Sequence, residues 1–173
     1  LPEPTEDDFQ ILNVKAAEAH EAGRYKEAVH YFERLLRARP DNTDLKLNLS
    51  AALVGDDQID KAVALLENTF STSKEKKECL FRLVPLYLKQ GLSLDIKLEE
   101  LNQRYLNNIV SAQHAIAKAL IMTYLGQFAE AADAYEIALE FDDTQKTRFD
   151  LSNIQLMLGR YVEGFENYRS RFS

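Results

Sequence analysis

The stretch Ala22 to Asn42 has the pattern of a turn, one amphipathic helix and a stop. Its apolar residues recur at steps of three and four, which places them on one side of an α-helix. They are Tyr25, Ala28, Val29, Phe32, Leu35 and Leu36. Gly23 suits a turn between helices because glycine accepts positive φ, and Pro40 disfavours helical backbone at Arg39. A single helix of this length is marginal in water, so it needs neighbouring helices.

The same pattern returns along the chain, and one turn residue marks each copy. These turn residues are Gly23, Asp57, Gly91, Gly126 and Gly159, separated by 34, 34, 35 and 33 residues. Asp57 replaces glycine in the second copy, and aspartate is among the side chains that tolerate the left-handed region. Most copies carry a small residue five positions after the turn and a large apolar one nine positions after it. The small residues predict close crossings of two helices.

This period predicts about ten helices in five antiparallel pairs. The first helices of the pairs are predicted at Phe9–Glu21, Asp44–Gly55, Lys76–Gln90, Ile109–Leu125 and Gln145–Leu158. The second helices are predicted at Tyr25–Ala38, Ile59–Phe70, Ser93–Tyr105, Phe128–Phe141 and Tyr161–Phe172. Residues 1–8 form an acidic lead-in, and an array covers residues 9–173. Its repeats span approximately 9–42, 43–76, 77–108, 109–144 and 145–173.

The third repeat departs from this pattern. Ser93 and Glu100 stand where the other copies carry apolar side chains. Pro85 lies inside the first helix, where it removes a backbone donor and should kink the helix. A helical stripe survives in the second helix, which predicts a helix with shifted packing. Its residues are Leu94, Leu98, Leu101 and Tyr105.

Three copies carry the pattern most clearly: AGRYKEAVHYF, LGQFAEAADAY and LGRYVEGFENY. Together with the period they resemble the tetratricopeptide repeat (TPR), a helix–turn–helix unit of about 34 residues. The resemblance covers Phe9 to Phe172. It implies an all-α fold, a right-handed superhelix of antiparallel helix pairs in which the first helix of each pair lines the concave face.

The resemblance also implies which residues face the groove, at fixed positions before each turn. They are Asn13, Val14, Ala17, His20 and Glu21 in the first repeat, and Leu47, Asn48, Ala51, Val54 and Gly55 in the second. They are Phe81, Arg82, Pro85, Leu88 and Lys89 in the third repeat, Ile116, Ala117, Leu120, Thr123 and Tyr124 in the fourth, and Phe149, Asp150, Asn153, Leu156 and Met157 in the fifth.

Nine of these positions are expected to form a peptide-binding groove: Leu47, Asn48, Phe81, Arg82, Lys89, Ile116, Leu120, Phe149 and Asn153. A row of apolar side chains along the groove, called the apolar ladder below, with polar side chains beside it suits an extended peptide or an amphipathic helix of another protein. The anchors expected to bury apolar side chains are Phe81, Ile116 and Phe149, while Asn48, Arg82 and Asn153 hold the ligand backbone. The alternative is that the ladder packs against a long second helix or a curled terminus.

Some TPR co-chaperones grip a C-terminal carboxylate with lysine, asparagine and arginine side chains. The matching positions in this chain hold Asn13, Ala17, Asn48, Glu78 and Arg82. The first lysine of that clamp is missing, and Glu78 puts negative charge where positive charge is needed. Because a carboxylate would meet repulsion there in place of charge-assisted hydrogen bonds, this clamp is not expected.

Composition narrows the partner to another protein. The 173 residues carry a formal net charge of −7, which disfavours nucleic acid as the main partner. No apolar run approaches the roughly 20 residues that a membrane-spanning helix needs, so no membrane insertion is expected. Cys79 is the single cysteine and favours a reducing, cytoplasmic location. The chain begins at Leu1, which leaves a removed signal peptide as the alternative.

No residue pattern indicates catalysis or a cofactor. The three histidines, His20, His30 and His114, do not share the spacing of metal ligands. Cys79 is expected to be a packed thiol, with a reactive thiolate at a helix start as the alternative. The glycines mark turns and form no phosphate-binding loop. We therefore expect no catalytic residue, no metal and no cofactor, and a scaffold rather than an enzyme.

The last repeat suggests two further roles. Its residues Arg160, Gly164, Phe165, Tyr168, Arg171 and Phe172 resemble the final repeat of bacterial TPR regions that precede glycosyltransferase-like domains. That resemblance implies an adaptor segment of a larger enzyme. The stripe of Phe165, Tyr168 and Phe172 lacks the polar cap usual at the end of an array. An end-face contact through these residues, including self-association through the last helix, is therefore a third hypothesis.

Overall fold

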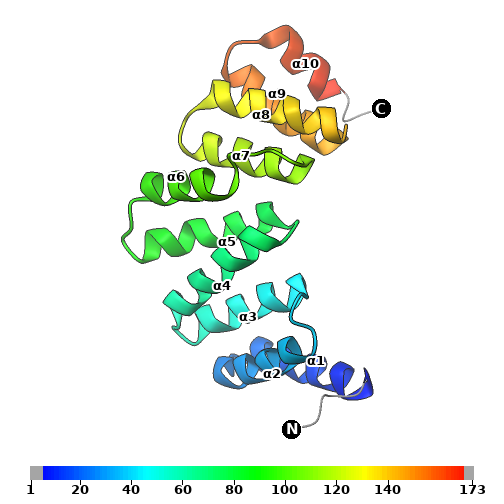
Figure 1. Ribbon diagram of the computed structural model, residues 1–173, viewed down its shortest axis with the longest axis vertical. Coiled ribbons are helices and arrows are strands. Elements are labelled where there is room, and N and C mark those ends of the chain that lie inside the picture. The colour runs from blue at the N-terminus through cyan, green and yellow to red at the C-terminus, as the bar shows by residue number, and fades with distance from the viewer. Residues whose placement is uncertain (1–5, 170–173) are drawn as a thin grey trace. The chain divides into compact units, whose positions relative to one another are not determined.

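The computed structural model describes residues 6–169, with side chains described from Asp8 onward. Within this range the chain forms ten α-helices and no strand, so the fold is all-α as predicted (Figure 1). The helices are α1 (Glu6–Glu21), α2 (Tyr25–Ala38), α3 (Thr43–Gly55), α4 (Ile59–Thr72), α5 (Lys76–Lys89), α6 (Leu94–Tyr105), α7 (Ala112–Tyr124), α8 (Phe128–Phe141), α9 (Gln145–Met157) and α10 (Tyr161–Arg169).

The helix ends follow the predicted ones closely, and the differences have local causes. Helices α2 and α8 have the predicted bounds. Helix α1 begins at Glu6, within the segment expected to be a lead-in. Helix α7 begins at Ala112 instead of Ile109, because Ser111 caps it by accepting the His114 N–H at 3.3 Å. Residues 170–172, the predicted end of the last helix, lie outside the described residues.

All five predicted turn residues adopt the left-handed conformation. Their φ angles are 72° at Gly23, 58° at Asp57, 69° at Gly91, 73° at Gly126 and 75° at Gly159. In four of these turns the next N–H donates to a carbonyl five residues earlier: Arg24 to Ala19, Gln58 to Leu53, Gln127 to Met122 and Arg160 to Gln155, at 2.8–2.9 Å. This bond closes the Schellman motif, which ends a helix and reverses the chain. The prediction that Asp57 adopts the left-handed conformation of a turn glycine is confirmed.

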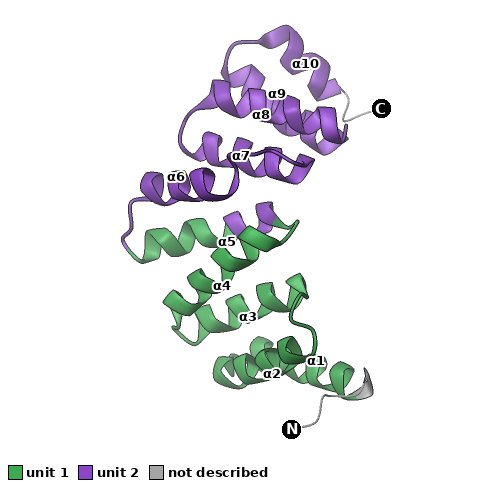
Figure 2. Cartoon of the chain, in the orientation of Figure 1, with its two compact units in different colours: residues 1–75, 81–90 green, residues 76–80, 91–173 purple. Residues whose placement is uncertain are grey.

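The chain divides into two compact units, shown in Figure 2. The first contains Leu1–Glu75 and Phe81–Gln90, and the second contains Lys76–Leu80 and Gly91–Ser173. In the first unit α1 packs against α2, α2 against α3, and α3 against α4. In the second unit α6 packs against α7, α7 against α8, α8 against α9, and α9 against α10. Within each unit, helices thus pack against their neighbours in sequence, as in a helix-pair repeat.

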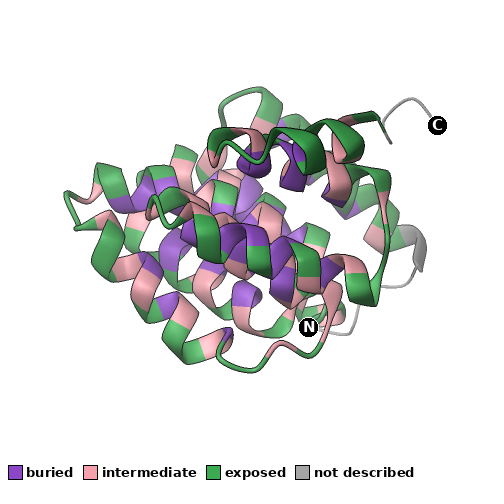
Figure 3. Ribbon diagram, turned by 90° about the horizontal axis from the view of Figure 1, so that it is seen from above, coloured by how far each residue is buried: buried purple, intermediate pink, exposed green. Residues whose placement is uncertain are grey.

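The buried core contains the positions that recur from copy to copy in the sequence. Figure 3 shows how far each residue is buried. The small residues five positions after the turn are buried at Ala28, Ala62, Ala131 and Gly164. The large ones nine positions after it are buried at Phe32, Leu66 and Tyr135. Small side chains let neighbouring helix axes approach, and the large ones fill the remaining space. The recurring positions therefore describe packing and not only sequence similarity.

Helix α6 of the third repeat uses a different set of residues for its buried side. Ile96 is 62% exposed and Glu100 is exposed, whereas Leu98 and Leu101 are buried. The predicted shift in packing is confirmed. The reason is that the apolar stripe of this helix is displaced along the sequence relative to the other copies.

Pro85 does not divide helix α5. The helix continues to Lys89, although Pro85 cannot donate a hydrogen bond to the carbonyl one turn earlier. Pro85 is exposed, while Leu83 and Tyr87 on either side of it are fully buried. The Tyr87 hydroxyl donates to Glu67 Oε1 at 2.7 Å. Burial of these flanking side chains holds the helix together across the proline.

Candidate partner-binding face

In the first unit, several positions that the repeat pattern assigns to the groove keep large apolar side chains exposed. Val14 of α1 is 55% exposed, and Phe81 and Leu88 of α5 are 46% and 58% exposed. Asn48 and Lys89 are exposed as well. Phe81 and Leu88 are seven residues apart and so share one side of α5. An apolar side chain that stays in water on a repeat helix is a candidate contact for a partner.

Leu47 does not belong to this exposed set, and the expectation that it lines the groove is corrected. Its side chain is only 6% exposed. Helix α3 packs against both α2 and α4, so a wide arc of its surface is buried, and Leu47 falls inside that arc. Its carbonyl accepts a hydrogen bond from Arg82 Nη1 at 3.0 Å. Arg82 is therefore already bonded to the backbone of α3.

A pocket of about 130 Å³ opens in the first unit between α1 and α3. Its lining consists of Ala17, His20 and Glu21 of α1, Phe32 of α2, and Asn48 and Ala51 of α3. All of these except Phe32 are concave-face positions by the repeat pattern. Phe32 is 3% exposed and forms the apolar floor, and the His20 ring meets the Tyr25 ring edge-on at 5.4 Å. The pocket thus combines an apolar floor with polar side chains from two repeats.

In the second unit the predicted apolar residues are more covered. Ile116, Leu120 and Phe149 are partly buried, whereas Asn153 is exposed. The Phe149 ring lies 5.8 Å from the Tyr168 ring of α10, so Tyr168 packs toward α9. The large apolar side chains that remain in water on this face are Tyr124 and Met157, which are 39% and 63% exposed.

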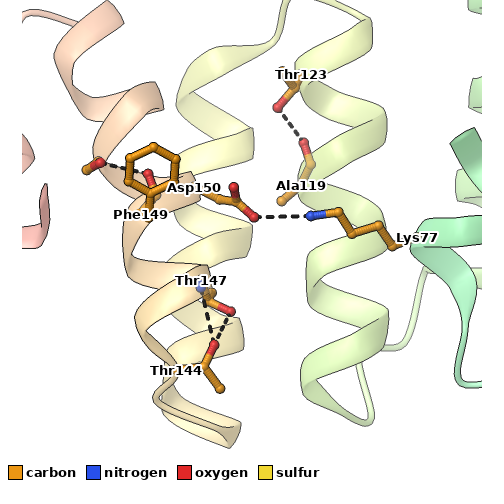
Figure 4. Close-up of polar contacts among 8 residues, drawn as sticks. Lys77, Ala119, Thr123, Thr144, Thr147, Phe149 and Asp150 are labelled. Carbon is orange, nitrogen blue, oxygen red and sulfur yellow. Dashed lines mark hydrogen bonds and ion pairs between the residues drawn. The ribbon is translucent and has the colours of Figure 1, made fainter. Parts of the chain in front are cut away.

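An ion pair crosses this part of the second unit (Figure 4). Lys77 Nζ of α5 lies 3.3 Å from Asp150 Oδ2 of α9, and both side chains are about one-quarter exposed, at 26% and 25%. Burial, and after it the Asp150 charge, raises the pKa of the Tyr135 hydroxyl, so Tyr135 stays protonated. Sequence reasoning missed this pair, because its members are 73 residues apart. The pair occupies Asp150, one of the positions that the repeat pattern assigns to the groove.

Polar side chains join α9 to α10. Asp143 and Arg148 form an ion pair in which Arg148 Nε donates to Asp143 Oδ1 at 2.6 Å. This hydrogen bond lowers the pKa of the Asp143 carboxyl. Arg148 Nη1 also donates to Asn167 Oδ1 at 3.3 Å, and Asn167 Nδ2 donates to Gln155 Oε1 at 2.9 Å. Gln155 is 4% exposed, so the chain of hydrogen bonds reaches the interior of the last helix pair.

Two basic side chains, Lys76 and His114, lie near the starts of α5 and α7. Lys76 is 2% exposed, and burial lowers the pKa of its ammonium group. Burial, and after it the Lys76 charge, also lowers the pKa of His114. Ser111 Oγ lies 2.8 Å from His114 Nδ1. The imidazole therefore favours its neutral form. Cys79 is fully buried, which agrees with the packed thiol expected from the sequence.

Within residues 6–169, no group of three or more histidine, cysteine, aspartate or glutamate side chains could hold a metal ion. No helix in the same range combines the length and the apolar character needed to cross a membrane.

Residues 19–75 match the family model described as the tetratricopeptide repeat. This segment belongs to the tetratricopeptide repeat family. The match covers the turns at Gly23 and Asp57 and the helices α2, α3 and α4. No curated protein matches the chain.

A solved structure of a TPR protein has a similar fold. TTC0263, a thermophilic TPR protein of Thermus thermophilus, superposes with a TM-score of 0.51 at 21% identity, over 92% of this chain and 88% of that one. MamA of Desulfovibrio magneticus RS-1 gives 0.49 at 14% identity, over 92% and 90%. MamA MSR-1 gives 0.47 at 22% identity, over 94% and 93%. At such identities the first similarity shows the fold and nothing about the partner.

The last described helix, α10, leaves an apolar patch in water. Tyr161, Val162 and Phe165 of α10 are 62%, 71% and 54% exposed. Of the three residues expected at an end-face contact, Phe165 belongs to this patch, Tyr168 contacts Phe149, and Phe172 lies outside the described residues. Sequence reasoning missed Val162, which extends the patch because it adjoins Tyr161 on the same helix.

Proposed function

We propose that the chain is a protein–protein interaction scaffold that binds a peptide or helical segment of another protein at the concave-face positions of its TPR helices. The observation that carries this proposal is the exposure of Phe81 and Leu88 on one side of α5. Large apolar side chains gathered in water usually mark an interaction site. The family pattern assigns both residues to the binding face, so exposure and position agree.

The polar groups near these anchors suit a peptide backbone. Asn48 is exposed and offers both a donor and an acceptor. Asn153 offers the same groups in the second unit, where Phe149, Ile116 and Leu120 supply partly buried apolar surface. Lys89 Nζ lies 3.8 Å from Asp57 Oδ1, and the Lys89 side chain is 57% exposed. Its charge therefore remains within reach of a ligand. Burying one apolar anchor contributes about 1.5–3 kcal/mol before the cost of ordering the peptide.

The test is a double substitution, Phe81→Ala with Phe149→Ala. A peptide selected from a display library on the unmodified chain is expected to bind the double variant at least tenfold more weakly, because both substitutions remove apolar side chains that the repeat pattern assigns to the binding face. The measurement is a calorimetric titration. The matched control is Phe141→Ala, since Phe141 is 52% exposed but lies on the second helix of its pair. It should leave the affinity unchanged.

One result would overturn the proposal. If the double variant keeps its helical circular dichroism and its thermal midpoint but binds every selected peptide with unchanged affinity, the concave face is not the binding site. If no peptide binds the unmodified chain, the scaffold function itself loses its support.

A second candidate function is self-association through the patch formed by Tyr161, Val162 and Phe165. The patch lies at the start of α10, and its residues Tyr161 and Val162 are more exposed than Phe81 and Leu88 of the first unit. Light scattering over a concentration series is expected to show a dimer that Phe165→Glu abolishes. A monomer at every concentration would contradict this candidate.

The adaptor hypothesis rests on the last repeat alone. Gly164, Phe165 and Tyr168 carry its resemblance to TPR regions that precede glycosyltransferase-like domains. Its test is whether the natural reading frame continues past Ser173 into a catalytic domain. A reading frame that stops at Ser173 would end this alternative.

A further inference from the structure

The pocket between α1 and α3 is too small for a metabolite-sized ligand. Its volume of about 130 Å³ compares with roughly 300–1,000 Å³ for typical small-molecule sites. A pocket of this size suits one long side chain of a bound peptide. It also lies on the face to which the proposed function assigns the peptide, because five of its lining residues are concave-face positions.

The polar side chains that line the pocket determine which charge a bound peptide side chain can carry. Among the described residues, Glu21 forms no salt bridge, and neither the Glu21 carboxylate nor the Asn48 amide has a hydrogen-bond partner. An ionised carboxylate only accepts hydrogen bonds, and the Asn48 carbonyl oxygen adds a second acceptor. An acidic ligand side chain would be repelled by Glu21. A purely apolar side chain would offer neither the Glu21 carboxylate nor the Asn48 amide a hydrogen-bond partner.

A basic side chain gives both the Glu21 carboxylate and the Asn48 amide a hydrogen-bond donor. Its charged end donates to Glu21 and Asn48 in charge-assisted hydrogen bonds. Its methylene stem lies against the apolar floor made by Ala17, Phe32 and Ala51. The net charge of −7 favours the approach of a cationic segment over an anionic one.

We propose that the pocket between α1 and α3 receives a lysine or arginine side chain of the partner peptide. This inference rests on the proposed function, because it names the chemistry of the peptide that the same face binds. It reverses the charge preference of the carboxylate clamp found in some TPR co-chaperones. The reversal follows from Glu21, which lines the pocket with negative charge.

The first experiment tests the pocket without any peptide. The isotope-labelled full chain is titrated with Nα-acetyl-lysine methylamide and, separately, with Nα-acetyl-norleucine methylamide, while backbone amide shifts are recorded. Saturable shifts at Ala17, Asn48 and Ala51 are expected with the lysine compound alone. Glu21→Gln should weaken this binding about tenfold, the loss expected for a charge-assisted hydrogen bond. The control Glu33→Gln should leave this binding unchanged, because Glu33 is an exposed residue of α2 outside the pocket.

Equal shifts with the norleucine compound, or binding that Glu21→Gln leaves unchanged, would overturn the inference. The absence of saturable shifts with the lysine compound would do the same. Each of these results tests the pocket alone and does not depend on whether the rest of the face binds a peptide.

The second experiment separates the inference from the proposed function. In a peptide selected on the unmodified chain, each lysine and arginine is replaced in turn by norleucine. One replacement is expected to weaken binding about tenfold to the unmodified chain but not to the Glu21→Gln variant. If the peptide depends on Phe81 and no basic residue couples to Glu21, the inference fails and the proposed function stands. If no peptide binds but the lysine compound saturates the pocket, the proposed function fails and the pocket assignment stands.

Discussion

Replacing Phe70 with alanine is expected to lower the free energy of unfolding by about 3–5 kcal/mol. Phe70 lies in α4 and is fully buried, so the substitution removes apolar contacts and leaves a cavity that the neighbouring helices fill only in part. Single domains are stable by only about 5–15 kcal/mol, so this loss is a large share. Urea unfolding followed by circular dichroism measures it.

The control for this prediction is Phe141→Ala. Phe141 also lies on the second helix of its pair, but it is 52% exposed, so truncation is expected to cost less than about 1 kcal/mol. Hydrogen exchange adds a local readout. In an array whose repeats contact only their neighbours, Phe70→Ala should accelerate amide exchange in α3 and α4, which pack against each other. Equal losses for the two variants would contradict the burial of Phe70.

Replacing Gly55 with alanine is expected to destabilise the protein by about 1–3 kcal/mol, although alanine favours helices. Gly55 is the last residue of α3, and a Cβ built on it would lie 2.5 Å from Cγ of Tyr25. The Tyr25 ring belongs to α2, which packs against α3. Since Cγ is the near end of the ring, the whole side chain must move to make room. Urea unfolding again gives the change in stability.

A double-mutant cycle identifies the cause. In a Tyr25→Ala background the clash is absent, so adding Gly55→Ala should be neutral or stabilising by up to about 1 kcal/mol. The sign of the substitution therefore reverses with the identity of residue 25. If Gly55→Ala costs the same in both backgrounds, the clash with the Tyr25 ring is not the reason for the glycine.

The turns and helix pairs could be predicted from the sequence because their causes are local. Positive φ at Gly23 or Gly126 is set by the absence of a Cβ, and an aspartate such as Asp57 can adopt the same conformation. The bounds of α2 and α8 follow from apolar residues at helical spacing between two such signals. Even the shifted stripe of α6 could be predicted from the spacing of Leu98 and Leu101.

The start of α7 shows where prediction from spacing loses resolution. Apolar residues before Ser111 suggest an earlier start, but the hydroxyl of Ser111 caps the helix. A cap depends on one hydrogen bond, and serine is also common in turns and loops that cap no helix. Spacing alone therefore locates a helix end only to within a few residues.

The candidate site was only partly predictable. The family pattern assigned Phe81 and Asn48 to one face, and both are exposed. It assigned Leu47 to the same face, where the packing of α3 between two helices buries it. The pocket beside Glu21 and the Lys77–Asp150 ion pair had no signal of their own. Both depend on the distance between side chains of different helices.

The sequence by itself determined the all-α architecture, its helix pairs and the left-handed turn residues, since each rests on interactions within about 34 neighbouring residues. The tertiary structure alone decided which side chains of a helix stay in water and which polar groups meet. Exposure depends on how many neighbours a helix packs against, and an ion pair depends on where two distant backbones bring their side chains. Neither quantity is encoded in the spacing of residues along one helix.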